Sequence, residues 1–168
     1  MTTNPLPIRT DGEPTRVLMV CLGNICRSPL AEGLLIHLAR ERGLDGRVLV
    51  ESCGTGGWHA GDAPDPRSLA VALKHGVNLP SRARQFDPGS DIEGFDLLIA
   101  MDSSNKTTLI ERGTPASKVR LMLDFHPQLT GEDVPDPYYG GPNGFDDVYE
   151  MVRVACEGLL DDLSLTVR

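Results

Sequence analysis

With 168 residues, the chain is long enough for one compact domain with its own hydrophobic core and too short for two ordinary domains. Its formal net charge of −8 argues against nucleic acid or an anionic membrane surface as a non-specific partner. Four cysteines, an N-terminus without a signal-like pattern and the lack of an apolar run of membrane length predict a cytoplasmic protein with reduced thiols and no membrane partner.

The chain begins with a polar segment, which is followed by one strand and one helix. Residues 1–15 carry several prolines and little apolar content, so we expect a flexible tail before a domain that spans 16–168. The uncharged aliphatic run at 17–20 predicts a buried strand that stops at Cys21. Ser28 is expected to cap the helix that comes next, because serine is a preferred residue at that position.

Strands and helices alternate along the rest of the chain. Apolar runs predict further strands at 47–52, 95–101 and 119–123, whereas capped or amphipathic stretches predict helices at 68–76, 102–112 and 145–163. We assign no chemistry to the polar stretch 81–91. This alternation indicates an α/β fold, a single small doubly wound domain with a four-stranded parallel sheet flanked by helices on both faces.

The predicted topology points to one site at one edge of the sheet. Ligands of such sheets bind outside the carboxyl ends of the strands. Cys21 lies at the end of the first strand, and Cys53, Asp102 and Asp124 follow the ends of other strands. A long Pro- and Asp-rich segment, 124–143, leaves the fourth strand on the same side, and a loop of that length in a compact domain is usually functional.

The loop between the first strand and the first helix has the residues of an anion-binding loop. Such a loop directs its N–H groups inward, at the positive end of the helix dipole. Gly23 and Asn24 supply positions that tolerate the left-handed backbone angles that a tight loop needs. The N–H groups, Arg27 and the hydroxyl of Ser28 would favour the thiolate of Cys21, which makes it a candidate nucleophile. Arg27 also offers a planar fork for two phosphoryl oxygens.

Plainer interpretations of these residues exist. Cys21 could be a small buried cysteine at a strand end, with a solvated Arg27 nearby. The strand before the loop and the helix after it argue against this interpretation. A metal site is disfavoured, because Cys21 and Cys26 have no third or fourth ligand in view.

Two separated segments resemble one known family. Residues 20–29 read Val-Cys-Leu-Gly-Asn-Ile-Cys-Arg-Ser-Pro, which resembles the phosphate-binding loop of the low-molecular-weight protein tyrosine phosphatases. Residues 136–140 read Asp-Pro-Tyr-Tyr-Gly, which is similar to that family's Asp-Pro-Tyr-Tyr segment. The resemblance implies that Cys21 attacks phosphorus, that Arg27 binds the phosphate and that Asp136 protonates the leaving oxygen. It implies no metal and no cofactor.

The resemblance also implies supporting residues. His75 would help to hold Asn24, although a lone histidine at a helix end is usually just a favourable charge. Asp102 would buttress the phosphate-binding loop. The substrate cleft would be lined by Trp58, Tyr138 and Tyr139. The residues that would bind phosphate or support the loop are Leu22, Gly23, Asn24, Ile25, Cys26, Ser28, His75 and Asp102.

The function implied is hydrolysis of phosphotyrosine in proteins, or of small aryl phosphates, through a phosphocysteine, with inorganic phosphate as product. Three alternatives remain. A protein-arginine phosphatase resembles this loop but is expected to carry Thr where this chain has Ile25. An arsenate reductase would need further cysteines, and Cys53 and Cys156 do not resemble that arrangement. A phosphotyrosine-binding module without activity would be expected to lack Cys21 or Asp136.

The second cysteine of the loop suggests sensitivity to oxidation. Cys26 lies close in sequence to the candidate nucleophile Cys21. We expect peroxide to oxidise Cys21 first and Cys26 then to capture it reversibly as a disulfide. The alternative is that Cys26 serves packing only.

Overall fold

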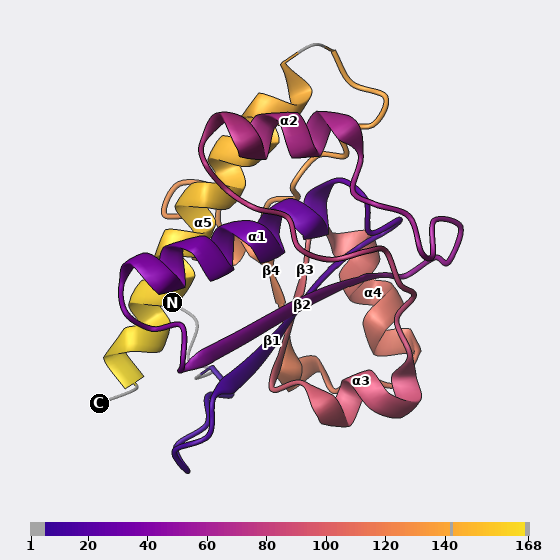
Figure 1. The fold of residues 1–168 in the computed structure, drawn as a ribbon. Coiled ribbons are helices and arrows are strands. Elements are labelled where there is room, and N and C mark those ends of the chain that lie inside the picture. The colour runs from indigo at the N-terminus through magenta and orange to yellow at the C-terminus, as the bar shows by residue number, and fades with distance from the viewer. Residues whose placement is uncertain (1–5, 142, 167–168) are drawn as a thin grey trace.

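The computed structural model describes residues 6–141 and 143–166, and a parallel sheet lies at its centre (Figure 1). The four strands are β1 (Thr15–Cys21), β2 (Val48–Gly54), β3 (Leu97–Ala100) and β4 (Val119–Leu121). Their order across the sheet is β2-β1-β3-β4, and all the pairings are parallel. The chain therefore winds outward from β1 in both directions, and the predicted doubly wound α/β fold is confirmed.

Helices cover both faces of the sheet (Figure 1). One face carries α1 (Arg27–Glu41) and α5 (Gly144–Thr166), with α2 (Pro66–Lys74) packed against both. The other face carries α3 (Pro88–Gly94) and α4 (Ser103–Glu111). Two short 3₁₀ helices, η1 (Ala116–Lys118) and η2 (Met122–Phe125), flank β4. None of the helices in the described ranges is long and apolar enough to cross a membrane.

The side chains of β3 show how the sheet divides the core. Leu97 and Ile99 belong to the larger cluster with α1 and α5, whereas Leu98 and Ala100 belong to a second cluster with Leu109 of α4. All five side chains are fully buried. Because helices cover both faces, such a strand is apolar throughout instead of alternating with polar residues.

A few boundaries differ from the prediction. β2 extends to Gly54, so Cys53 lies within the strand and not after it. β4 ends at Leu121, because the backbone turns into η2 there and the Asp124 carboxylate accepts a hydrogen bond from the Leu121 N–H. α3 was not predicted, since its seven residues are too few for a periodic signal, and the Asp87 side chain caps it.

Residues that precede β1 contact the domain. Leu6 and Ile8 pack against the larger core cluster. The guanidinium of Arg9 lies 3.7 Å from the carboxylate of Asp96, the residue just before β3. These contacts were not expected from the sequence. The rest of the predicted flexible tail, residues 1–5, lies outside the described residues.

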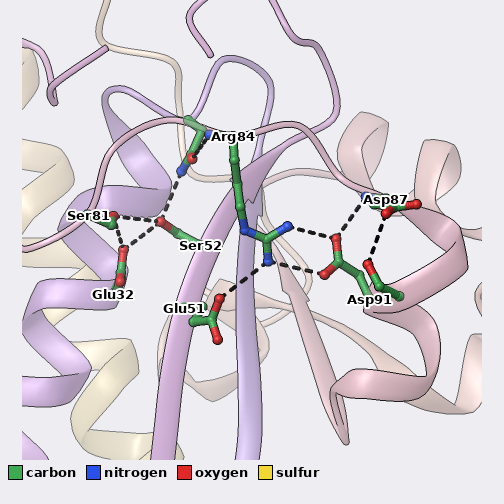
Figure 2. A network of polar contacts seen from close by, with 9 residues as sticks. Glu32, Glu51, Ser52, Ser81, Arg84, Asp87 and Asp91 are labelled. Carbon is green, nitrogen blue, oxygen red and sulfur yellow. Dashed lines mark hydrogen bonds and ion pairs between the residues drawn. The ribbon is translucent and has the colours of Figure 1, made fainter. Parts of the chain in front are cut away.

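A buried carboxylate joins α1 to β2 (Figure 2). Glu32 is only 3% exposed, and its Oε1 accepts hydrogen bonds from Ser52 Oγ at 2.5 Å and from Ser81 Oγ at 2.6 Å. Burial raises the pKa of Glu32 above its usual 4.5, although the two hydroxyl donors act in the opposite direction. The donors reduce the cost of placing a carboxylate inside the protein.

The close packing of α5 against η2 at Gly158 generates a prediction about stability. A Cβ added at Gly158 would collide with the carbonyl oxygen of Phe125 in η2. We expect Gly158→Ala to lower the free energy of unfolding by about 1–3 kcal/mol, because the helix must move away from η2. Gly46 has open space around its Cβ position, so Gly46→Ala is the matched control and should stay within about 0.5 kcal/mol of the parent. Urea denaturation measures both, and equal stabilities for the two variants would contradict the prediction.

The buried Glu32 generates a prediction about pH. Its pKa is higher in the folded chain than in the unfolded one, so the carboxyl group ionises first in the unfolded state as the pH rises. Its contribution to stability is therefore present below the unfolded pKa and is lost as the pH rises through the folded pKa. We expect the unfolding free energy of the parent, minus that of Glu32→Gln, to fall as the pH rises above 4.5, the usual pKa of the group. Urea denaturation across a pH series tests it, and a difference that rises with pH would show the opposite sign.

Candidate active site

The loop between β1 and α1, residues 21–27, turns four carbonyl groups outward. Their oxygens accept hydrogen bonds from the segment after β2, in the pairs Cys21–Thr55, Leu22–Gly56, Ile25–Asp65 and Cys26–Ser68. A trans peptide is planar, so the N–H group of each following residue points away from the carbonyl before it. The N–H groups of residues 22, 23, 26 and 27 therefore face the inside of the loop, next to the positive end of α1. This is a favourable environment for an anion.

Asn24 fixes the turn of the loop. Among the described residues other than glycine, it alone has a left-handed backbone, with φ of 58°. Its main-chain N–H donates to Cys21 Sγ at 3.2 Å. Of the two positions expected to tolerate a left-handed angle, Asn24 adopts one and Gly23 has no positive φ. A Cβ at Gly23 would lie 3.1 Å from the His59 ring, a tight contact that the partly exposed ring would have to relieve.

The side-chain amide of Asn24 connects three parts of the chain. Its Nδ2 donates to Ser28 Oγ at 2.8 Å and to Ser52 Oγ at 3.0 Å. Its Oδ1 accepts a hydrogen bond from the main-chain N–H of Arg84 at 3.0 Å. The amide is therefore held by α1, by β2 and by the segment between α2 and α3.

His75 was predicted to hold Asn24, and this prediction is wrong. The His75 ring stacks on Tyr149 of α5, with 4.2 Å between the ring centroids. His75 caps α2, which packs against α5, so the ring is directed toward that helix. Ser52 and Arg84 provide the contacts to Asn24 that were expected from the histidine.

Ser28 was expected to cap α1, but the helix begins at Arg27, after Cys26. The hydroxyl of Ser28 instead lies 3.0 Å from Cys21 Sγ. Because the Ser28 oxygen accepts a hydrogen bond from Asn24, its own proton remains available, to the sulfur at 3.0 Å or to the more distant Cys53 carbonyl at 3.4 Å. The contact between Ser28 and Cys21 agrees with the hydrogen bond that was predicted.

Arg27 is buried and held from one side. Its Nη1 donates to Asp102 Oδ2 at 2.6 Å and to the Val134 carbonyl at 3.0 Å. Its Nη2 lies 3.8 Å from Asp136 Oδ2. Burial opposes the charge, but Cys21, Asp102 and Asp136 together raise the pKa of Arg27, so the guanidinium stays charged. Asp102 therefore contacts the loop through Arg27, in line with the predicted buttress.

Asp136 meets the loop from a distant part of the chain. It lies between η2 and α5, and its Oδ1 accepts a hydrogen bond from the Tyr138 N–H at 3.1 Å. Its side chain is 44% exposed, whereas that of Arg27 is 4% exposed. Cys21, Arg27 and Asp136 line a single cavity of about 240 Å³.

The mouth of this cavity is aromatic and open. Trp58 is 73% exposed and Tyr139 is 92% exposed, so they form a rim that a substrate can cover. The guanidinium of Arg67 lies 5.1 Å from the centroid of the Tyr138 ring and supports it. The remaining lining residues are Leu22, Gly23, Ile25, Cys26 and His59.

Burial keeps Cys26, Cys53 and Cys156 protonated. Burial raises the pKa of Cys26 to about 12, and the nearby carboxylate of Asp65 acts in the same direction. Burial also raises the pKa of Cys53 and that of Cys156. These three side chains are therefore neutral thiols at neutral pH. Capture of an oxidised Cys21 by Cys26 stays a prediction.

Sequence reasoning missed several residues around the site. His59 was not predicted, yet it lines the cavity and its Nδ1 lies 3.3 Å from Asp62 Oδ2. The sequence holds one indication of Glu32 and Ser52: each is a polar residue among apolar ones, in a helix or at a strand end, and a buried polar side chain needs a hydrogen-bond partner. Arg84 gave no signal. Across residues 6–141 and 143–166, no three His, Cys, Asp or Glu side chains are gathered so that they could hold a metal ion.

Comparisons with known proteins agree with this geometry. A low molecular weight protein-tyrosine-phosphatase of Streptomyces coelicolor is 46% identical over 151 residues, which are 86% of this chain and 91% of the relative. The crystal structure of YfkJ from Bacillus subtilis has a TM-score of 0.88 at 36% identity and covers 94% of this chain and 99% of its own. A Drosophila arginine phosphatase has a TM-score of 0.79 at 32% identity, with 86% and 95% covered. The family described as low molecular weight phosphotyrosine protein phosphatase matches residues 16–168, and the chain therefore belongs to that family.

Proposed function

We propose that this protein hydrolyses phosphotyrosine in proteins, or related aryl phosphates, and releases inorganic phosphate. The observation that carries the proposal is the meeting of Cys21, Arg27 and Asp136 in one cavity. The inward N–H groups of the loop and the charged guanidinium suit a phosphate dianion. The names of the relatives and the membership of the family support the same activity.

The reaction would proceed in two displacements at phosphorus. The Cys21 thiolate attacks, the bond from phosphorus to the leaving oxygen breaks, and Asp136 gives its proton to that oxygen. Water then attacks the phosphocysteine while Asp136 takes a proton from it, which restores the thiolate. Arg27 and the N–H groups stabilise the charge on the phosphoryl oxygens in both steps. The Ser28 proton stabilises the thiolate as nucleophile and as leaving group.

The residues at the mouth favour an aromatic substrate. Ile25 adds an apolar side chain beside Trp58, Tyr138 and Tyr139, and a phenyl ring can be buried among them. Serine and threonine phosphates would be too short to bring phosphorus to Cys21 while their peptide stays outside. One structural relative is an arginine phosphatase, so phosphoarginine is the competing substrate to test. We also place the protein in the cytoplasm, since its cysteines are unpaired.

The roles of Cys21 and Asp136 predict different kinetic signatures. Cys21→Ser should abolish turnover while inorganic phosphate still binds, because the loop and Arg27 remain. Asp136→Ala should slow phenyl phosphate by about 10²–10⁴-fold and slow a substrate with a good leaving group, such as dinitrophenyl phosphate, far less. Steady-state kinetics and phosphate titration measure these effects. Equal losses on both substrates would remove Asp136 from the role of acid, and full activity of Cys21→Ser would exclude the phosphocysteine.

The apolar side chain of Ile25 predicts the choice between substrates. We expect kcat/KM to be higher for a phosphotyrosine peptide than for a phosphoarginine peptide. Ile25→Thr should shift the ratio toward phosphoarginine by roughly tenfold or somewhat more, because one apolar contact is worth about 1–3 kcal/mol. Ile25→Val is the matched control, since it keeps an apolar branched side chain. A ratio that is unchanged in Ile25→Thr would show that residue 25 does not set the substrate class.

A further inference from the structure

Only one orientation of the Asn24 amide satisfies its neighbours. The main-chain N–H of Arg84 can only donate, so it faces Oδ1, at 3.0 Å. Nδ2 is thereby turned toward Ser28 Oγ, at 2.8 Å. Ser28 then acts as acceptor toward Asn24 and keeps its proton for Cys21 Sγ, 3.0 Å away.

Loss of this orientation would change where the Ser28 proton goes. If the amide turned over, its oxygen would face Ser28 and compete with the Cys21 sulfur for that proton. The carbonyl of Cys53, 3.4 Å from Ser28 Oγ, is a second competing acceptor. A thiolate without its hydroxyl donor is less stable, because a hydrogen bond to a charged group is stronger than one to a neutral group.

The Arg84 side chain is anchored at its guanidinium (Figure 2). The guanidinium donates two hydrogen bonds to Asp91 of α3, at 2.9 and 3.1 Å, and the Asp91 side chain is only 5% exposed. Asp91 also accepts a hydrogen bond from the Asp87 N–H at 2.8 Å, so it is rigidly placed. Glu51 of β2 approaches the same guanidinium at 3.6 Å, but it is 56% exposed. The Arg84 carbonyl in turn accepts a hydrogen bond from the Gly54 N–H at 2.8 Å.

We propose that Arg84 is a positioning residue for the nucleophile. Asp91 holds the guanidinium, the Arg84 N–H sets the Asn24 amide, and the amide reserves the Ser28 proton for the Cys21 thiolate. As far as turnover is concerned, this rests on the proposed function. The effect on Cys21 itself is measurable without any phosphorylated substrate.

The experiment compares two variants that remove a negative charge from the same guanidinium, Asp91→Asn and Glu51→Gln. The readout is the rate at which iodoacetamide alkylates Cys21, followed by mass spectrometry across a pH series. For Asp91→Asn we expect the midpoint of the profile to rise by about 0.5–1 pH unit, because the thiolate loses its donor. A field effect alone would lower the midpoint, since a negative charge is removed. Glu51→Gln should leave the midpoint close to that of the parent, because the exposed ion pair between Glu51 and Arg84 contributes little to the position of the Arg84 side chain.

The same comparison in an Asn24→Gly background tests whether Arg84 acts on Cys21 through the Asn24 amide. Glycine tolerates the left-handed backbone of residue 24 and removes the side-chain amide. If Arg84 acts through Asn24, Asp91→Asn should have no further effect in this background. The proposal is overturned if Asp91→Asn lowers the midpoint or leaves it unchanged. It is also overturned if Glu51→Gln raises the midpoint as much as Asp91→Asn does, or if Asp91→Asn has the same effect in the Asn24→Gly background.

The turnover of a phosphotyrosine peptide is a second, independent measurement on the same variants. In Asp91→Asn, kcat should fall about 3–10-fold while KM stays within about twofold, because Arg27 and the loop still bind phosphate. A parent protein without phosphatase activity but with the expected alkylation shifts would refute the proposed function and leave the positioning role standing. If Asp91→Asn does not fold, the paired variant Arg84→Met with Asp91→Leu removes both charges without leaving one buried alone. It should raise the alkylation midpoint in the same way, and an unchanged midpoint would overturn the proposal.

Discussion

The outward hydrogen bonds of the loop carbonyls are the constraint on which the candidate site depends. The segment after β2 lies along the loop after β1 and donates hydrogen bonds to four of the loop's carbonyl oxygens. These bonds restrict the conformation of the loop. The N–H groups are thereby directed inward before any ligand arrives. A loop that had to turn its peptide groups on binding would lose part of the binding free energy to ordering. The parallel pairing of β1 with β2 brings the two segments together at one edge of the sheet.

The charges at the site explain how a protein with a negative net charge can bind an anion. The chain carries a net charge of −8, yet Arg27 lies buried at the loop with its charge retained. Two carboxylates flank it, and they differ in exposure: the Asp102 side chain is 19% exposed and that of Asp136 is 44% exposed. The more buried one bonds to Arg27 directly and keeps the guanidinium in place. The more exposed one lies 3.8 Å from Arg27 Nη2, at the cavity, where we propose that it acts as the acid.

Two successive turns of helix α1 contribute residues to the site. Its first turn supplies Arg27 and Ser28, which face the cavity and the sulfur. Its next turn supplies Glu32, which binds the hydroxyl of Ser52, and Ser52 in turn accepts a hydrogen bond from Asn24. The loop is therefore attached to the buried body of the helix that follows it. A rigid attachment of this kind keeps a nucleophile within the narrow range of positions that catalysis requires.

The sequence by itself determined the strand, loop and helix around Cys21, and the chemistry of Arg27 beside it. These groups are adjacent in the chain, so local backbone geometry is enough to bring them together. Only the tertiary structure decided which groups hold Asn24. Its partners Ser52 and Arg84 are 28 and 60 residues away in the chain, and hydrophobic periodicity carries no information about such polar pairs. The resemblance assigned one of these contacts to His75, but α2 packs on α5 and the His75 ring stacks on Tyr149 instead.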